Sequence, residues 1–194
     1  PLGKLDCCLV TDGGAAVVMT RSDRANDTKN TPIYLLGAAM EHHHRMISEM
    51  PDLVQTSAIE SGKRAFSMSG YKPNDMSTIQ LYDAFTINTL LFLEDLGFCK
   101  KGEAKELVKN KNIGPAGNLK VNTNGGGLSC VHPGMYGLFV TLEALRQLRN
   151  ASGDDVGQRL DGGWIDNAKL SVAHGNGGVL SSQVTNIWGV SETI

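Results

Sequence analysis

The sequence lacks the features that mark several broad classes of protein. Its 194 residues carry a formal net charge of −2 and show no broad basic field, which argues against nucleic acid as a partner. No apolar run is long enough to cross a bilayer, and the first residues lack the basic and apolar regions of a secretory signal. We therefore expect no membrane association and a cytoplasmic location.

Cysteine is also sparse, and several catalytic signatures are missing. The four cysteines show no Cys-x-x-Cys spacing and are too few for a disulfide scaffold, so we expect reduced thiols. The Asn-Gly-Gly run lacks the Lys-Ser/Thr ending of a phosphate loop, and no Gly-x-Ser-x-Gly sequence surrounds Ser129. The run from His42 to His44 is a poor metal site, because consecutive residues of an extended segment point to opposite faces. We expect no bound metal.

The composition is that of one ordinary globular domain. Hydrophobic residues make up 41% of the chain and charged residues 20%, a balance that allows a proper core and argues against disorder. Because the first residue is Pro1 rather than Met, we expect a processed product or a piece of a longer protein.

The alternation of apolar patterns predicts a layered α/β domain with a mixed sheet and helices on its faces. Glycine at position 70 and again at position 97 indicates where two of the helices end. The expected elements are strand pieces over 5–19, a polar linker over 21–31, a strand over 33–40, a helix over 53–69, a strand from 78, a helix over 86–97, a charged segment over 100–111, a short strand ending at 121, a helix over 138–149, a polar loop over 150–163, and closing strands over 168–173 and 179–188.

The stretch 122–137 concentrates the chemistry of the chain. It is a glycine-rich turn from a strand to a helix, and it contains a lone imidazole, His132, beside Pro133. Three consecutive glycines upstream let a ligand approach the backbone closely. We therefore consider Asn124, Gly125 and Gly126 as substrate-binding candidates, together with Gly177 from a later glycine-rich turn.

Three turns that follow strands carry polar side chains, and ligands of open α/β sheets bind at the carboxyl ends of strands. The turns contain Tyr82, His132 and His174. If the turns converge, these side chains form a compact site floored by glycines and suited to polarising a carbonyl and moving a proton.

In order and spacing, the three turns resemble those of the C-terminal half of the thiolase superfamily. The family has an Asn-Glu-Ala-Phe turn, an Asn-x-Asn-Gly-Gly…Gly-His-Pro turn and a Cys-x-Gly-Gly-Gly turn. Here they read Tyr82-Asp-Ala-Phe85, Asn122-Thr-Asn-Gly-Gly126 with Val131-His-Pro133, and Ala173-His-Gly-Asn-Gly177. An early Asp-Gly-Gly-Ala-Ala sequence also resembles a strand of the family's N-terminal half, and the lipid-transfer-protein or sterol-carrier-type thiolases are the most similar subgroup.

The resemblance implies a thiolase-like C-terminal half with a mixed five-stranded sheet, over 26–194, preceded by a terminal strand of the missing N-terminal half and a linker over 1–25. It implies that His132 helps to activate a nucleophilic cysteine in the missing half and donates to the thioester oxyanion. Tyr82 replaces the motif asparagine, and Ala173 replaces the second cysteine. His174 could supply an acid or base or could only hydrogen-bond the turn, and Tyr136 is typical of the subgroup.

The implied function is that of a thiolase-like acyl-CoA acyltransferase, an enzyme that makes or breaks a carbon–carbon bond next to a CoA thioester, with this fragment inactive alone. The alternatives are a retro-aldolase of 3-hydroxyacyl-CoA side chains and a non-catalytic lipid-transfer or scaffold subunit. The implied substrate is an acyl-CoA, with no covalently bound cofactor. The implied partners are the missing half, a second copy in a homodimer of the full-length protein, and a small protein with an OB fold and a zinc ribbon.

Overall fold

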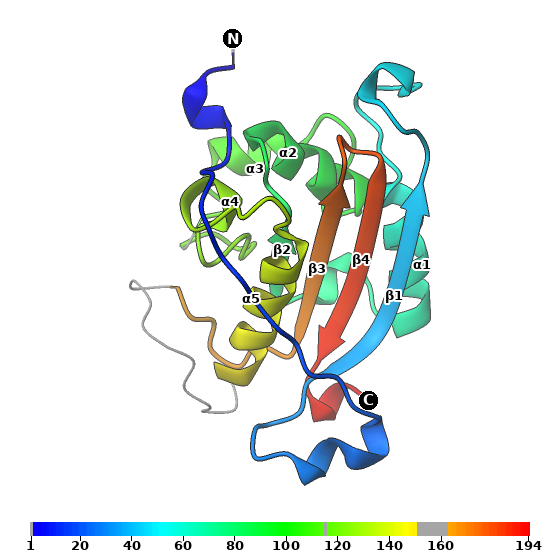
Figure 1. Ribbon diagram of the computed structural model, residues 1–194, viewed down its shortest axis with the longest axis vertical. Coiled ribbons are helices and arrows are strands. Elements are labelled where there is room, and N and C mark those ends of the chain that lie inside the picture. Colours follow the sequence, from blue (N-terminus) through cyan, green and yellow to red (C-terminus); the bar gives the residue numbers. More distant parts are fainter. Residues whose placement is uncertain (1, 115, 151–162) are drawn as a thin grey trace.

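The computed structural model describes residues 2–114, 116–150 and 163–194, which form a mixed sheet with helices on both faces (Figure 1). The strand order is β1-β4-β3-β2, with β2 parallel to β3 and the other two pairings antiparallel. The strands are β1 (Tyr34–His42), β2 (Thr78–Leu81), β3 (Leu170–Gly177) and β4 (Ser182–Gly189). The predicted layered α/β architecture is confirmed.

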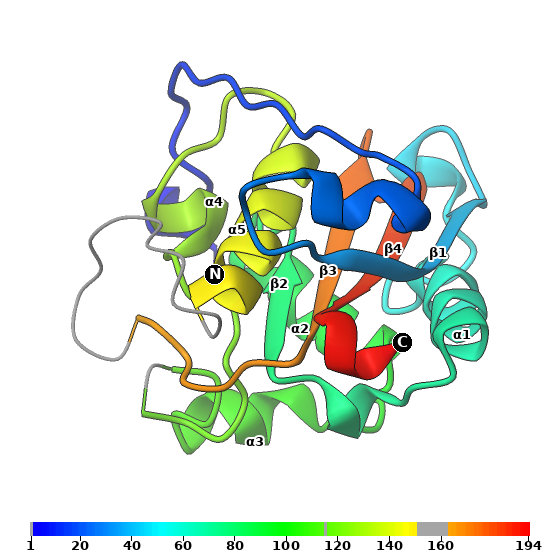
Figure 2. The same cartoon turned by 90° about the horizontal axis from the view of Figure 1, so that it is seen from below.

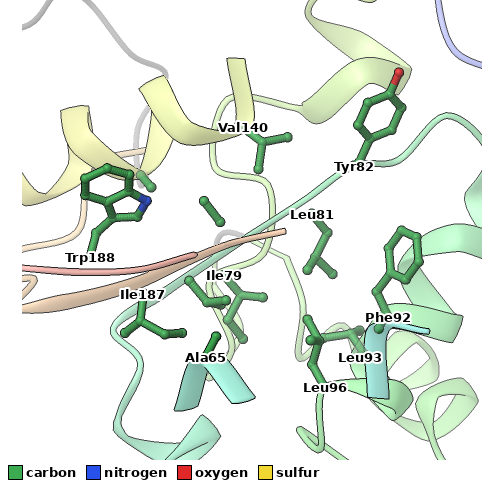
Figure 3. Close-up of a cluster of buried hydrophobic side chains, with 14 of the residues drawn as sticks. Ala65, Ile79, Leu81, Tyr82, Phe92, Leu93, Leu96, Val140, Ile187 and Trp188 are labelled. Carbon is green, nitrogen blue, oxygen red and sulfur yellow. The ribbon is translucent and has the colours of Figure 1, made fainter. Parts of the chain in front are cut away.

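Two long helices cover opposite faces of this sheet. α1 (Ala58–Ser69) packs on β1 and β4, whereas α5 (Gly137–Asn150) packs on β3 and β2 from the other side (Figures 1 and 3). The remaining helices are α2 (Thr86–Asp95), α3 (Ala104–Lys109) and α4 (Gly126–Ser129). α2 lies beside α1, so its apolar residues extend the core on the α1 side of the sheet (Figure 3).

The core residues follow the local sequence pattern. The buried positions of α1 are spaced by three and four residues, as a helix with one buried side requires; they are Ala58, Ser61, Gly62, Ala65 and Phe66. The helix ends at the expected Gly70, which takes φ 76°. It begins at Ala58 rather than near residue 53, and the hydroxyl of Thr56, two residues earlier, accepts the Ala58 N–H at 3.1 Å.

The sheet has four strands among the described residues, so the expectation of five strands is wrong. The segment before Asn122 pairs with β2 only through one bridge between Ile79 and Val121. The pairing stops because Asn122 takes φ 47°, and its side-chain oxygen accepts the N–H of Leu81 at 2.7 Å. The side chain of Asn122 thus accepts the Leu81 N–H, which the backbone of a continuing fifth strand would otherwise have bound.

The N-terminal segment forms no strand over residues 5–19, which corrects a second expectation. It runs along α5 instead of joining the sheet, and it touches the rest of the chain through bridges from Cys7 to Phe85 and from Val10 to His132 (Figures 1 and 2). Its residues 22–27, within the expected linker, form a short 3-10 helix.

Three other differences concern element boundaries. The charged segment 100–111 is helical only in α3, and the glycine-rich turn contains the unexpected one-turn helix α4. β3 continues to Gly177, through residues that we expected to form a turn. The polar loop expected over 150–163 falls almost entirely outside the described residues.

Candidate active site

Three aromatic rings meet at the end of β2, beside the turn that leads into α5. The rings of Tyr82 and His132 lie edge to face with centroids 5.4 Å apart, and those of Tyr82 and Tyr136 do so at 5.7 Å. The rings of His132 and Tyr136 are nearly parallel at 6.1 Å. The structure therefore brings together three of the four residues that the sequence suggested as catalytic.

Tyr82 reaches this cluster because it is the first residue after β2. Side chains alternate across a sheet, so Leu81 points to the α1 side and Tyr82 to the α5 side (Figure 3). The N–H of Tyr82 donates to the carbonyl of His174 at 3.0 Å, which extends the pairing of β2 with β3. Burial raises the pKa of the Tyr82 phenol above its usual value of 10, so the phenol is neutral at physiological pH.

His132 is held by its backbone, which leaves its ring available. The His132 N–H donates to the Thr11 hydroxyl at 3.1 Å, and its carbonyl accepts the Thr11 N–H at 3.4 Å. The ring atom Nε2 is buried and has no hydrogen-bond partner in the described part of the chain. A buried polar atom without a partner is costly, which makes this nitrogen a candidate for a contact to a ligand.

Tyr136 is fixed at the start of α5. Its side chain is 1% exposed, and its ring stacks on that of Phe139 with centroids 6.0 Å apart. The hydroxyl lies 3.2 Å from Nδ2 and 3.3 Å from Oδ1 of Asn124, so it either accepts from or donates to that amide. Burial raises the pKa of the Tyr136 phenol, which is therefore also neutral at physiological pH.

The substrate-binding candidates lie in two places. Asn124 joins the cluster through Tyr136, and its Oδ1 also accepts the Gly126 N–H at 2.9 Å. Gly125 and Gly126 take φ of 93° and 66°, values that L side chains rarely adopt, so the turn requires glycine there. Gly177 is the last residue of β3 and pairs with Ser182 of β4.

Three residues near the cluster were not among the expected site residues. The buried Asp83 follows Tyr82 directly, and its Oδ1 accepts the Gly127 N–H at 2.6 Å. Cys8 is half-buried; burial raises the pKa of its thiol, and the charge of Asp83 adds to this rise. Asp83 stands inside a recognised motif and could have been found from it, whereas Cys8 and Thr11 reach the site only through tertiary contacts.

His174 is not part of this cluster. It pairs with Leu81 in the sheet and therefore lies on the α1 side, where its ring meets that of Phe92 at 4.5 Å between centroids. Both ring nitrogens are occupied: Nδ1 lies 2.9 Å from the Thr185 hydroxyl, and Nε2 lies 2.8 Å from Oε1 of Gln183. The expected convergence of all three turns thus holds for two of them.

The burial of His174 predicts a pH-dependent stability. Burial lowers its pKa from 6.5 to about 4, while the Gln183 hydrogen bond acts in the opposite direction. Between these values the unfolded chain binds a proton that the folded chain does not, so stability falls as the pH falls. The expected loss on acidification from neutral pH is on the order of 3 kcal/mol.

This prediction is checked by the free energy of unfolding in denaturant, measured across that pH range for wild type and His174→Gln. The variant cannot bind the proton and is expected to lose less stability on acidification than wild type. His43→Gln is the matched control, because the side chain of His43 is exposed, and its free energy of unfolding should depend on pH as that of wild type does. An equal pH dependence for His174→Gln and wild type would show that His174 does not titrate in this way.

The histidines at positions 42–44 lie at the end of β1 and in the loop after it, and two of them contact neighbouring polar groups of the protein. His42 Nδ1 lies 3.0 Å from the Ser182 hydroxyl, and His44 Nε2 lies 3.1 Å from the Val179 carbonyl. No group of three His, Cys, Asp or Glu side chains in the described ranges could hold a metal ion. Within the same ranges, no helix combines the length and apolar character that a membrane span requires.

Comparisons with known proteins match this chain to one family. Residues 39–190 match the family model described as "Thiolase C-terminal domain-like". The 17-hydroxy-3-oxo-4-pregnene-20-carboxyl-CoA lyase of Mycobacterium tuberculosis is 40% identical over 163 residues, which cover 80% of this chain and 41% of the lyase. The acetyl-CoA acetyltransferase of Methanothermobacter thermautotrophicus is 30% identical over 190 residues, covering 97% of this chain and 48% of that protein.

A solved structure agrees with these matches. The Ltp2-ChsH2(DUF35) aldolase superimposes with a TM-score of 0.84 at 29% identity, over 98% of this chain and 48% of that chain. The chain thus spans less than half the length of each of these relatives.

Proposed function

Because the chain belongs to the thiolase C-terminal domain-like family, we propose that it is the C-terminal half of an enzyme acting on a CoA thioester, and that the enzyme makes or breaks the adjacent carbon–carbon bond. The observation that carries this proposal is the buried Nε2 of His132, which has no hydrogen-bond partner among the described residues and belongs to a ring that adjoins two phenols. Such a nitrogen can donate to a thioester carbonyl oxygen as negative charge develops there. The substrate is an acyl-CoA, and no covalently bound cofactor takes part.

Retro-aldol cleavage of a 3-hydroxyacyl-CoA side chain fits this site best. In that reaction the 3-hydroxyl group loses its proton and the C2–C3 bond breaks. As the bond breaks, C3 leaves as a carbonyl, and the electron pair of the bond gives the thioester enolate character and takes a proton at C2. Tyr82 suits the exchange, because a neutral phenol can give its own proton to C2 while its oxygen takes the hydroxyl proton in the same step, and so ends neutral. His132 binds the enolate oxygen, and Tyr136 with Asn124 bounds the site on the α5 side.

Thiolase-type acyl transfer is the second candidate, supported by the acetyltransferase relative that aligns with 97% of the chain. The thiolase pattern uses a second cysteine near the C-terminus to move the proton of the Claisen step. Ala173 stands at that position and has no ionisable group, so acyl transfer needs a different acid or base here. His174 is a poor substitute, because both of its nitrogens are engaged on the opposite side of the sheet. We propose that it supports the turn by hydrogen bonding.

The rest of the enzyme is also part of the proposal. We propose that residues 1–25 pack with the missing N-terminal half and that 26–194 form the C-terminal domain. The side chains of Leu5, Val10 and Val18 are 93%, 92% and 96% exposed, which suits a segment that another layer covers. The related aldolase structure pairs Ltp2 with ChsH2(DUF35), which supports a small partner subunit, and we expect the full-length protein to be a homodimer.

The test is a turnover assay of the intact protein on 3-hydroxyacyl-CoA and 3-ketoacyl-CoA thioesters, with Tyr82→Phe as the variant. We expect kcat on 3-hydroxyacyl-CoA to fall by about 10²-fold, because phenylalanine retains the packing but cannot exchange a proton. Tyr71→Phe is the matched control, since it removes a hydroxyl that binds the Thr193 carbonyl away from the cluster.

The outcomes separate the candidates. Turnover of 3-hydroxyacyl-CoA that depends on Tyr82 supports the aldolase. Release of acetyl-CoA or propionyl-CoA from 3-ketoacyl substrates alone selects acyl transfer. Binding of acyl-CoA without turnover of either class contradicts both enzyme proposals and leaves the lipid-transfer or scaffold alternative.

A further inference from the structure

The N-terminal segment hydrogen-bonds the backbone of the candidate site at successive points along residues 8–11. The Cys8 N–H donates to the carbonyl of Ala84, in the turn after β2, at 2.9 Å. The Leu9 N–H donates to the carbonyl of Gly127, in α4, at 3.1 Å. The segment passes α4 and then runs along α5, so it connects the turn after β2 with the turn before α5 (Figure 1).

The next contact of the segment is a two-way link between Thr11 and His132. The His132 N–H donates to the Thr11 hydroxyl at 3.1 Å, and the Thr11 N–H donates to the His132 carbonyl at 3.4 Å, so the hydroxyl makes the shorter bond. Packing continues two residues later, because a Cβ on Gly13 would lie 3.2 Å from Cγ2 of Val131 and 3.4 Å from Cβ of Pro133. The segment therefore holds the backbone of the histidine and packs against both of its chain neighbours.

The imidazole of His132 depends on this backbone for its position. Among the described residues, neither ring nitrogen has a hydrogen-bond partner that would set the orientation of the ring. In many catalytic sites a carboxylate or a backbone carbonyl binds the second nitrogen of the histidine and orients it. Here the ring is bounded by those of Tyr82 and Tyr136, with centroids 5.4 Å and 6.1 Å away, and its place between them follows from where its backbone is held.

We propose that Thr11 is a positioning residue for His132, whose hydroxyl fixes the backbone from which the imidazole reaches the thioester oxygen. This role rests on the proposed function for its chemical meaning. Charge develops on that oxygen only as the carbon–carbon bond breaks, so a displaced donor weakens binding of the transition state more than binding of the substrate. Because Thr11 belongs to residues 1–25, the segment that we propose to pack with the missing half also holds the oxyanion donor of this half.

The test compares Thr11→Val with Thr11→Ser in the intact protein, by steady-state kinetics on a 3-hydroxyacyl-CoA. Valine has nearly the shape of threonine but cannot accept the His132 N–H, whereas serine can. In Thr11→Val we expect kcat to fall on the order of tenfold, with KM within about twofold of wild type. Thr11→Ser is expected to restore kcat to within about threefold of wild type.

Thr28→Val is the matched control for the loss of a threonine hydroxyl. The Thr28 hydroxyl lies 3.1 Å from the carbonyl of Ala25 and 3.1 Å from that of Asn30, in the same N-terminal segment but at the opposite end of α5 from α4 (Figure 1). Both kcat and KM of this variant should equal those of wild type.

Hydrogen exchange and NMR report the position of His132 without turnover. In Thr11→Val we expect the His132 amide to exchange faster than in wild type, on the order of tenfold, because it has lost its acceptor. The ring protons of His132 should shift as well, since they lie among the ring currents of Tyr82 and Tyr136. The Tyr82 N–H, which donates to the His174 carbonyl, is the internal control and should keep its exchange rate.

The outcomes separate this role from the proposed function. If wild type cleaves no acyl-CoA, the proposed function fails, while the exchange rates and ring shifts still decide whether Thr11 holds His132. A folded Thr11→Val protein with wild-type kcat, or with wild-type exchange at the His132 amide, overturns the role. Thr11→Ser with as little activity as Thr11→Val also overturns it, because the methyl group rather than the hydroxyl would then matter.

Wild type alone decides the case in which Thr11→Val does not fold. The His132 amide is expected to be protected from exchange, because it is bonded to the Thr11 hydroxyl. A His132 amide that exchanges as fast as the amides of exposed loops would show that the hydroxyl does not hold it, and the proposal would be wrong.

Discussion

Replacing His132 with alanine is expected to lower turnover of 3-hydroxyacyl-CoA by the intact protein by about 10³-fold. The reason is that its buried Nε2, which has no partner within the described chain, is the group placed to bind the enolate oxygen. Because that charge develops only as the C2–C3 bond breaks, kcat is expected to fall much more than KM rises. Steady-state kinetics on a 3-hydroxyacyl-CoA measures both quantities.

Two controls make the His132 result specific. His43→Ala removes an exposed histidine and should leave the kinetics unchanged. His132→Gln retains a hydrogen-bond donor and is expected to keep more activity than His132→Ala. Turnover of His132→Ala within about threefold of wild type would contradict the proposed role, since loss of one oxyanion donor commonly costs much more.

The second large effect is expected from Gly126→Ala, which should lower the free energy of unfolding by about 4 kcal/mol. Two costs combine at this position. The residue takes φ 66°, which strains any L side chain, and the new Cβ would lie 2.0 Å from the buried carboxylate of Asp83. Denaturant unfolding of the intact protein measures the loss, and turnover should fall as well, because the turn carries His132.

Gly134→Ala separates these two costs. Gly134 takes φ 77° in the same turn region, but a Cβ there would meet nothing within 4 Å. It therefore carries the backbone strain alone, and we expect a loss of about 1–2 kcal/mol. Equal losses in Gly126→Ala and Gly134→Ala would show that packing against Asp83 contributes nothing.

Much of the fold was predictable because its signals are local. The spacing of buried residues identified α1, and Gly70 identified its end, since helix periodicity and a left-handed cap depend only on neighbouring residues. The start of α1 was misplaced because it depends on Thr56, whose N–H and hydroxyl both bind the distant Asp95. No local pattern reports that contact.

The number of strands was misjudged for a related reason. Residues up to Val121 have the composition of a strand, and the family resemblance implied a fifth strand in the sheet. Whether a segment extends a ladder depends on the conformation of the residue that follows, and Asn122 ends the pairing by turning and binding Leu81 with its side chain. Likewise, residues 5–19 are apolar but have no sheet partner among the described residues beyond two isolated bridges.

For the candidate site, the sequence by itself determined that Tyr82 lies in the turn after a strand and that His132 lies in the glycine-rich turn before a helix, because motif order and spacing carry that information. Only the tertiary structure decided which side chains share a face. His174 was expected to join them, but β3 continues through Gly177 against β4, and strict alternation along a strand then directs His174 to the α1 side. Asp83, Cys8 and Thr11 came into the site for the same physical reason: burial and contact depend on how distant segments pack, which residue spacing alone does not specify.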